Sequence, residues 1–278
     1  MAILTFWSGS KKETGQTLSL VAIATHMSIE YEYKTLIIDA TLDDDTINRC
    51  FWKMDINRDL KRELNMGKLD FATGTEGLIT AIASNKTTSE IIPNYTKVVH
   101  KKLDVLLGLK ATVASDHEKS LLLYSDLLTA ANKCYDLVLV DLSKTDGRES
   151  TRQILKMSDV VMYTMSQNLK QINQYKEIKD NMPELRGKKV VPLLCNVDEF
   201  SKYNPKNVAA YVKNKELSHV LHNNTFLEAA SEAEVAKFFY SSRLSKSFRD
   251  KNSQFVESVA EASKLVVKKF EEIRYGIK

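Results

Sequence analysis

The sequence is poor in the residues that form cross-links and tight turns, with 3 cysteines, 4 prolines and 9 glycines among 278 residues. Cys50, Cys134 and Cys195 lie far apart and form no CxxC pair. This spacing argues against a disulfide framework and against a zinc site. We therefore expect reduced thiols in a cytosolic core. No low-complexity segment and no internal repeat is visible.

Long apolar runs are also lacking. The run from Ala2 to Trp7 is too short for a signal peptide, and nowhere do eighteen apolar residues follow one another. We expect no transmembrane segment and a cytoplasmic location, with peripheral contact to the inner face of a membrane left open. The histidines show no metal-binding spacing; His219 and His222 lie three apart, and we interpret them as surface or core residues. A net charge of +4 does not by itself indicate nucleic acid as a partner.

Hydrophobic residues make up 43% of the chain and charged residues 27%, which permits a sizeable core with a polar surface. Several short apolar runs are continuous rather than alternating, which is typical of strands buried on both faces of a parallel sheet. The expected strands are Ile3–Trp7, Thr35–Ala40, Leu103–Leu107, Leu137–Leu142, Val160–Thr164 and Val190–Cys195.

Amphipathic stretches separate these strands. The expected helices are Thr17–Tyr33, Thr75–Ser84, His117–Lys133, Glu149–Lys156, Lys170–Asn181 and Pro205–Lys215. This alternation predicts an α/β fold, with a doubly wound, mostly parallel sheet and helices on both faces. We expect a single domain over residues 1–278.

The C-terminal region, about 231–274, is predicted to be helical. Apolar residues at three- and four-residue steps form one stripe there: Phe255, Val259, Ala262, Val266, Phe270 and Ile273. We interpret the stripe as a helix that closes the core. Docking of a partner or an anionic membrane is the alternative, which the neighbouring glutamates disfavour.

A polar loop follows the first strand, and a helix follows the loop. Its sequence from Ser8 to Thr17 is SGSKKETGQT. A strand, a loop and a helix N-terminus are the setting of a phosphate loop, because backbone N–H groups and the helix dipole there favour an anion. The standard pattern is G-x-x-x-x-G-K-[ST]. Here Gly9 lies six positions before Gly15, one more than usual, and Gln16 stands in place of the lysine.

The loop resembles the variant phosphate loop of the ParA/MinD family, K-G-G-x-G-K-[ST]. The resemblance places Lys11 on the signature lysine that reaches the partner's nucleotide, Gly15 on the invariant glycine and Thr17 on the Mg²⁺ ligand. Lys12 and Glu13 replace two glycines, and Lys12 is a candidate to compensate for the missing charge. Gln16 can donate only a neutral hydrogen bond where the family has a second lysine, and Glu13 adds negative charge near the triphosphate.

Three later segments extend the resemblance. Asp39, at the end of Leu36-Ile37-Ile38-Asp39, matches the first acid of the family's I-D-x-D segment. Thr41 stands where the second, water-orienting acid would be, and Asp43, Asp44 and Asp45 follow as candidates to replace it. The resemblance implies that Asp39 or one of these nearby acids orients water. Asp141 ends the Walker B-like segment YDLVLVD and would approach Mg²⁺. Asn196 follows a further strand and is a candidate for adenine contact. All lie at C-terminal strand ends, where ligands bind in such sheets.

The resemblance implies a homodimer with ATP and Mg²⁺ between protomers. The middle of the chain, Thr75 to Leu109, is loosely similar to the TadZ/CpaE-like branch that places pilus and secretion machines. We therefore expect a protein with weak or absent hydrolysis that positions a membrane-associated assembly through a protein partner. An active ATPase that partitions DNA, through Arg243, Lys246, Arg249 and Lys251, is the alternative, and a scaffold that binds no nucleotide is a third.

Overall fold

The computed structural model describes residues 1–10, 14–41, 45–53, 74–83, 89–108, 123–143, 149–244 and 250–276. Within these residues, one sheet of eight strands has the order β3-β4-β2-β5-β1-β6-β7-β8. The strands are β1 (Ala2–Trp7), β2 (Thr35–Ala40), β3 (Lys97–His100), β4 (Leu103–Leu106), β5 (Leu137–Leu142), β6 (Val160–Met165), β7 (Lys189–Val197) and β8 (Ser218–Leu221). All neighbouring pairs are parallel except β3 and β4. This confirms the predicted α/β, mostly parallel sheet.

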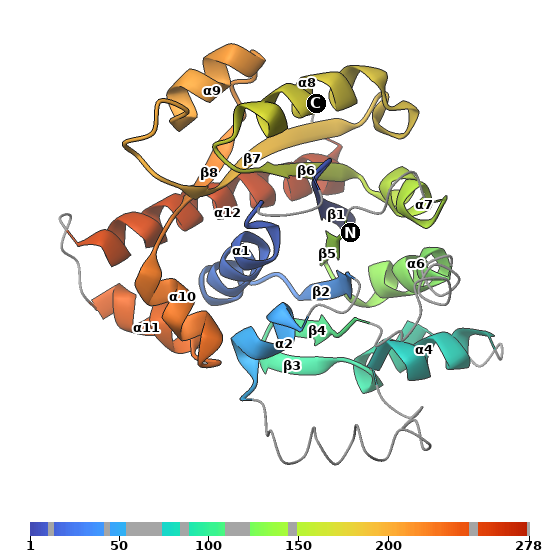
Figure 1. Ribbon diagram of the computed structural model, residues 1–278. Coiled ribbons are helices and arrows are strands. Elements are labelled where there is room, and N and C mark those ends of the chain that lie inside the picture. The colour runs from blue at the N-terminus through green and yellow to red at the C-terminus, as the bar shows by residue number, and fades with distance from the viewer. Residues whose placement is uncertain are drawn as a thin grey trace, which may run out of the picture.

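Helices cover both faces of the sheet (Figure 1). One face carries α1 (Gln16–Glu30), α2 (Thr46–Phe51), α10 (Asn224–Ser231), α11 (Val235–Leu244) and α12 (Lys251–Tyr275). The other carries α4 (Gly74–Ala83), α6 (Tyr124–Cys134), α7 (Glu149–Met157), α8 (Leu169–Asn181) and α9 (Pro205–Val212), with the 3₁₀ turns η1 (Ser89–Asn94) and η2 (Pro183–Leu185).

Each central strand contributes to a core on both faces, which explains why the apolar runs are continuous. In β1, Leu4 and Phe6 belong to the core under α1, whereas Ile3 and Trp7 belong to the opposite core. Alternate side chains of a strand point to opposite faces, so a strand covered on both sides needs apolar residues at every position.

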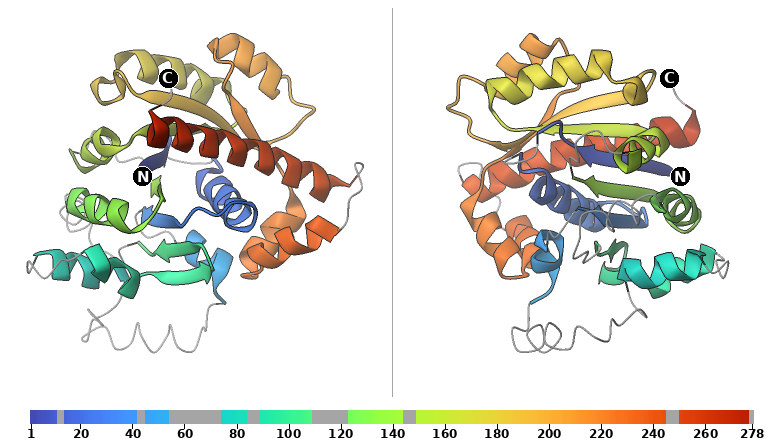
Figure 2. Two further views of the ribbon diagram at one scale, coloured as in Figure 1. Left: turned by 180° about the vertical axis from the view of Figure 1, so that it is seen from behind. Right: turned by 45° about the vertical axis from the view of Figure 1, so that its right-hand side comes forward.

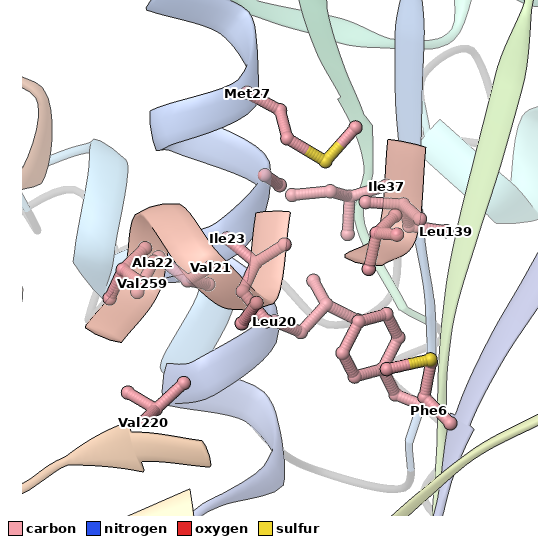
Figure 3. Close-up of a cluster of buried hydrophobic side chains, with 14 of the residues drawn as sticks. Phe6, Leu20, Val21, Ala22, Ile23, Met27, Ile37, Leu139, Val220 and Val259 are labelled. Atoms are coloured by element: carbon pink, nitrogen blue, oxygen red, sulfur yellow. The ribbon is translucent and has the colours of Figure 1, made fainter. Parts of the chain in front are cut away.

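Helix α1 is buried on nearly every side, from Ser19 to Ser28. A helix that is apolar all round lies inside a protein. Figure 3 shows side chains of α1, among them Leu20 and Met27, pointing toward Phe6, Ile37 and Leu139 of the sheet. This packing fixes the N-terminal end of α1, and thus the loop before it, against the sheet.

Helix α12 crosses the same face (Figure 2). Five of the six residues of the predicted apolar stripe are buried, and Ile273 is half-buried. Phe255, Val259 and Phe270 are 0–1% exposed, and burial of one such side chain stabilises the fold by about 1.5–3 kcal/mol. The stripe therefore closes the core, as expected. Lys269, on the same helix, is only 2% exposed and pairs with Glu216 and Glu272.

Several predicted boundaries and elements need correction. The helix expected over Thr17–Tyr33 ends at Glu30, and that expected over Pro205–Lys215 ends at Val212, where Lys213 takes a left-handed φ of 52°. The helix expected from His117 is described only from Tyr124. The elements predicted from the sequence do not include β3, β8, α2 and α10, because such short elements give little periodic signal.

Candidate functional site

The residues singled out from the sequence gather at the C-terminal edge of the central strands. Asp39 of β2 and Asp141 of β5 are register partners on adjacent strands, and Phe6 of β1 pairs with Asp141 on its other side. The loop from β1 to α1 and Asn196 of β7 lie at the same ends of their strands. The fold therefore assembles a polar site where parallel sheets bind ligands. Lys11, Lys12 and Glu13 lie outside the described residues.

Gly15 precedes the first residue of α1 and has a φ of +70°. A Cβ added there would lie 3.0 Å from Cys195 Cβ and 3.4 Å from Asn196 Cβ. Both the backbone angle and the close approach of β7 therefore require glycine. Within the described residues, no side chain caps the N-terminus of α1, and its first turn carries no acid. Uncapped N–H groups at a helix start suit an anion such as phosphate.

Gln16, which stands in place of the lysine, directs its side-chain amide toward the C-terminal ends of β5 and β6. Its Nε2 donates to Asp141 Oδ1 at 2.5 Å and to the carbonyl oxygen of Leu142 at 3.1 Å. The hydroxyl of Thr164 donates to Gln16 Oε1 at 2.7 Å. These bonds use both amide hydrogens and the amide oxygen. The side chain thus contributes hydrogen bonds to β5 and β6 and carries no positive charge of its own.

Thr17 and Asp141 meet as the resemblance implies. Thr17 Oγ1 donates to Asp141 Oδ2 at 2.6 Å, and the Asp141 side chain is fully buried. Hydroxyl and carboxylate oxygens are ligands that Mg²⁺ accepts, and nucleotide-bound Mg²⁺ takes its other ligands from phosphates and water. The pair fits a magnesium ion in that setting. Among the described residues, no cluster of three or more His, Cys, Asp or Glu side chains could hold a metal by itself.

Asp39 lies buried beside Asp141, and Thr41 holds it. The Thr41 backbone N–H and hydroxyl donate to Asp39 Oδ1 at 3.0 and 2.6 Å, and Tyr124 OH donates to the Asp39 backbone carbonyl at 3.2 Å. Gly108 passes so close that an added Cβ would lie 3.0 Å from the Asp39 carboxylate. The residue that replaces the family's second acid therefore fixes the first one. Of the nearby acids that are candidates to replace the second acid, Asp43 and Asp44 lie outside the described residues, and Asp45 is half-buried at the start of α2.

The start of the loop between β1 and α1 is held by residues that were not predicted from the sequence. Gly9 N–H donates to Tyr163 OH at 3.2 Å, and Gln174 of α8 donates to the Gly9 carbonyl at 2.8 Å. Burial raises the pKa of Tyr163 to about 12, so the phenol stays neutral at physiological pH. Burial likewise raises the pKa of Cys195, next to Gly15, to about 12, which keeps it an unreactive thiol. These contacts join segments about 150 residues apart, which no local pattern reveals.

Asn196, expected near the base, is exposed at the end of β7, and its side chain meets a histidine. Its Oδ1 lies 2.6 Å from His222 Nδ1, and Asn224 Oδ1 lies 2.9 Å from His222 Nε2. His219 makes no such contact and is half-buried; burial lowers its pKa. The two histidines therefore do not act as a pair.

The basic cluster considered for DNA is only partly described. Arg243 pairs with Glu30 at 2.6 Å, and Lys246 and Arg249 lie outside the described residues.

None of the helices in the described part of the chain has the length and apolar character needed to cross a membrane.

No protein-family model and no curated protein matches the sequence, but solved structures do. A ParA family ATPase from Chlorobium tepidum has a TM-score of 0.67 at 12% identity, over 95% of this chain and 97% of that chain. The septum site-determining protein MinD from Pyrococcus horikoshii, complexed with Mg-ADP, has a TM-score of 0.66 at 13% identity, over 96% and 98%. A plasmid partition protein from Borrelia burgdorferi, bound to AMPPNP, has a TM-score of 0.61 at 15% identity, over 96% and 99%.

At these identities the likeness concerns the fold, and it extends over almost the whole of both chains. In this fold Asp39, Asp141 and Asn196 lie at the ends of β2, β5 and β7, and Gln16 begins α1. The chain has the fold of the ParA/MinD family of P-loop ATPases.

Proposed function

We propose that this protein is a nucleotide-dependent dimerising protein with weak or absent ATP hydrolysis, and that it positions or scaffolds a membrane-associated assembly. The observation that carries the proposal is that the neutral, hydrogen-bonded amide of Gln16 stands in place of the lysine. Its amide is bonded to Asp141, Leu142 and Thr164, so it supplies no positive charge to a transferred phosphoryl group. Phosphoryl transfer depends on positioning and charge neutralisation, and loss of that charge slows it.

Other features of the site support nucleotide binding. The uncapped start of α1 after Gly15 offers N–H donors to phosphates. Bound with ATP, Mg²⁺ would neutralise phosphate charge, and Thr17 and Asp141 are the residues that would hold it. Two solved neighbours contain Mg-ADP or AMPPNP. Asp39, held by Thr41, is the carboxylate that would orient water if hydrolysis occurs.

Protein partnership rests on a different likeness. A MinC:MinD complex from Aquifex aeolicus matches with a TM-score of 0.62 at 11% identity. That structure shows the same architecture bound to another protein. We extend this to a membrane-associated partner, such as a pilus or secretion machine, and to a homodimer.

Calorimetric titration with Mg·ATP, with mass followed by light scattering and phosphate release measured in parallel, tests the proposal. We expect saturable binding, a shift to dimer mass and turnover far below that of an intact family member. No binding at millimolar ATP contradicts nucleotide dependence. Rapid Mg²⁺-dependent turnover contradicts the weak-hydrolysis part alone.

A matched pair of variants on α1 sharpens the titration. Thr17→Val removes the hydroxyl that contacts Asp141, and we expect it to weaken Mg²⁺-dependent ATP binding about tenfold. Thr25→Val is the control, because the Thr25 hydroxyl is buried without a partner in the described structure. Equal ATP affinities of the two variants contradict a metal site at Thr17.

DNA partition is the second candidate, because plasmid partition proteins are among the matching structures. It predicts sequence-independent DNA binding that weakens steeply with salt. A mobility-shift assay at low salt tests it, and unchanged DNA mobility removes it.

A further inference from the structure

Asn196 has an unusual backbone conformation at the ligand edge of the sheet. Its φ is +56°, and it is exposed between the buried residues Cys195 and Val197. Leu194 pairs with His219 and Val197 pairs with Leu221, so three steps along β7 face two steps along β8. Such a bulge re-aims a side chain and is common beside active sites.

This conformation has a cost that the rest of the fold must offset. A non-glycine residue in the left-handed region is strained, although asparagine tolerates it better than most. Strain of this kind concentrates at ligand sites. A Cβ at Gly15 would lie 3.4 Å from Asn196 Cβ, so the bulge adjoins the start of α1, where phosphate is expected.

His222 holds the side chain that the bulge presents. The ring nitrogens of His222 lie 2.6 Å from Asn196 Oδ1 and 2.9 Å from Asn224 Oδ1. The His222 backbone N–H also donates to the carbonyl of Val197 at 2.9 Å. Amide oxygens only accept, so each of these two contacts is a hydrogen bond when the ring nitrogen that faces it carries a proton. The amide of Asn196 therefore has its oxygen toward the imidazole, and its NH₂ group remains for another acceptor.

We propose that His222 is a positioning residue for nucleotide base recognition. It orients Asn196 so that the amide NH₂ donates to an acceptor nitrogen of a purine ring. This inference rests on the proposed nucleotide site and adds to it the residue that sets the base contact. Purines carry ring nitrogens that accept hydrogen bonds. The triphosphate part of ATP has no such ring nitrogens.

The test compares Mg·ATP with Mg·tripolyphosphate, which has the phosphates but no base. Both are titrated by calorimetry into the full chain, the His222→Ala variant and the Asn196→Gly variant. Glycine at 196 keeps the left-handed backbone without strain and removes only the amide. His219→Gln is the control, because His219 lies on β8, three residues before His222, and makes no hydrogen bond to Asn196 in the described structure.

We expect His222→Ala and Asn196→Gly each to weaken ATP about tenfold, as for one lost hydrogen bond. Tripolyphosphate binding should stay within about twofold, and His219→Gln should leave both ligands within about twofold. A purely structural role of His222 would weaken both ligands equally, and this result overturns the inference. Unchanged ATP affinity in His222→Ala also overturns it.

The two proposals fail in different ways. If the unaltered protein binds neither ligand, the nucleotide site is wrong and the role of His222 falls with it. If it binds both and the variants do not separate them, only the role of His222 is wrong.

Discussion

Among single residues, Gln16 has the largest effect on what the phosphate loop can do. A lysine at this position would bring a positive charge to the C-terminal end of β5, next to Asp141, whereas the glutamine brings a neutral amide that Asp141, Leu142 and Thr164 already engage. The loop thus keeps its attachment to the sheet and loses a charge.

Restoring that charge should strengthen nucleotide binding. We expect Gln16→Lys to raise the affinity for Mg·ATP about tenfold, because a charge-assisted bond to phosphate is stronger than a neutral one. Gln16→Met is the control of similar length without charge, and it should give no gain. Calorimetric titration measures both. An unchanged affinity in Gln16→Lys would mean that phosphate does not reach this position.

Gly15 is a residue whose identity the backbone conformation dictates. Gly15→Ala and Gly187→Ala both place a side chain at positive φ, but only position 15 meets β7, whereas position 187 has nothing within 4 Å. We expect Gly187→Ala to lower the free energy of unfolding by about 1 kcal/mol. Gly15→Ala should lower it by a further 1–3 kcal/mol or so through crowding against Cys195. Urea denaturation compares them, and equal losses would contradict the tight approach.

At the scale of elements, α12 is anchored at its C-terminal end by a buried cation. Lys269 Nζ lies 2.5 Å from Glu216 and 3.3 Å from Glu272, and its side chain is 3% exposed. Hydrogen bonds from Lys189 and Lys269 lower the pKa of Glu272. A lowered carboxyl pKa contributes stability above the unfolded-state pKa, and this contribution is lost as pH falls through the folded-state pKa.

Two adjacent lysines provide a matched test of this anchor. Lys268 lies near the same glutamates, at 4.0 and 3.9 Å, but is 63% exposed. We expect Lys269→Ala to lower the free energy of unfolding by about 2–3 kcal/mol at neutral pH. Lys268→Ala should change it by less than about 0.5 kcal/mol. Thermal or urea unfolding measures the difference, and similar effects of the two changes would contradict the anchor.

For the whole molecule, both cores share the same strands, so neither helical layer has a core of its own. Residues of β1, β2 and β5 contribute to both clusters. We therefore propose that the chain unfolds as one cooperative domain. The fluorescence of Trp7, buried at the end of β1, in a Trp52→Phe background should follow the same urea transition as helical circular dichroism. Two separate transitions would contradict a single domain.

The sequence by itself indicated the architecture, because periodicity is a local property. Continuous apolar runs such as Leu137–Leu142 predicted buried parallel strands, and Gly15, Thr17 and Asp141 were identified in their order along the chain. The short elements β3, β8 and α10 escaped, since a strand of four residues carries too little pattern to separate from a loop.

Only the tertiary structure decided how the site residues meet. The sequence showed that Gln16 replaces a lysine, but not that its amide bonds to Asp141 and Thr164. From the sequence, His222 was interpreted as an ordinary surface or core residue, whereas the fold brings it into contact with Asn196. Hydrogen bonds between residues that lie far apart in the chain depend on strand order and register, and neither leaves a local trace in the sequence.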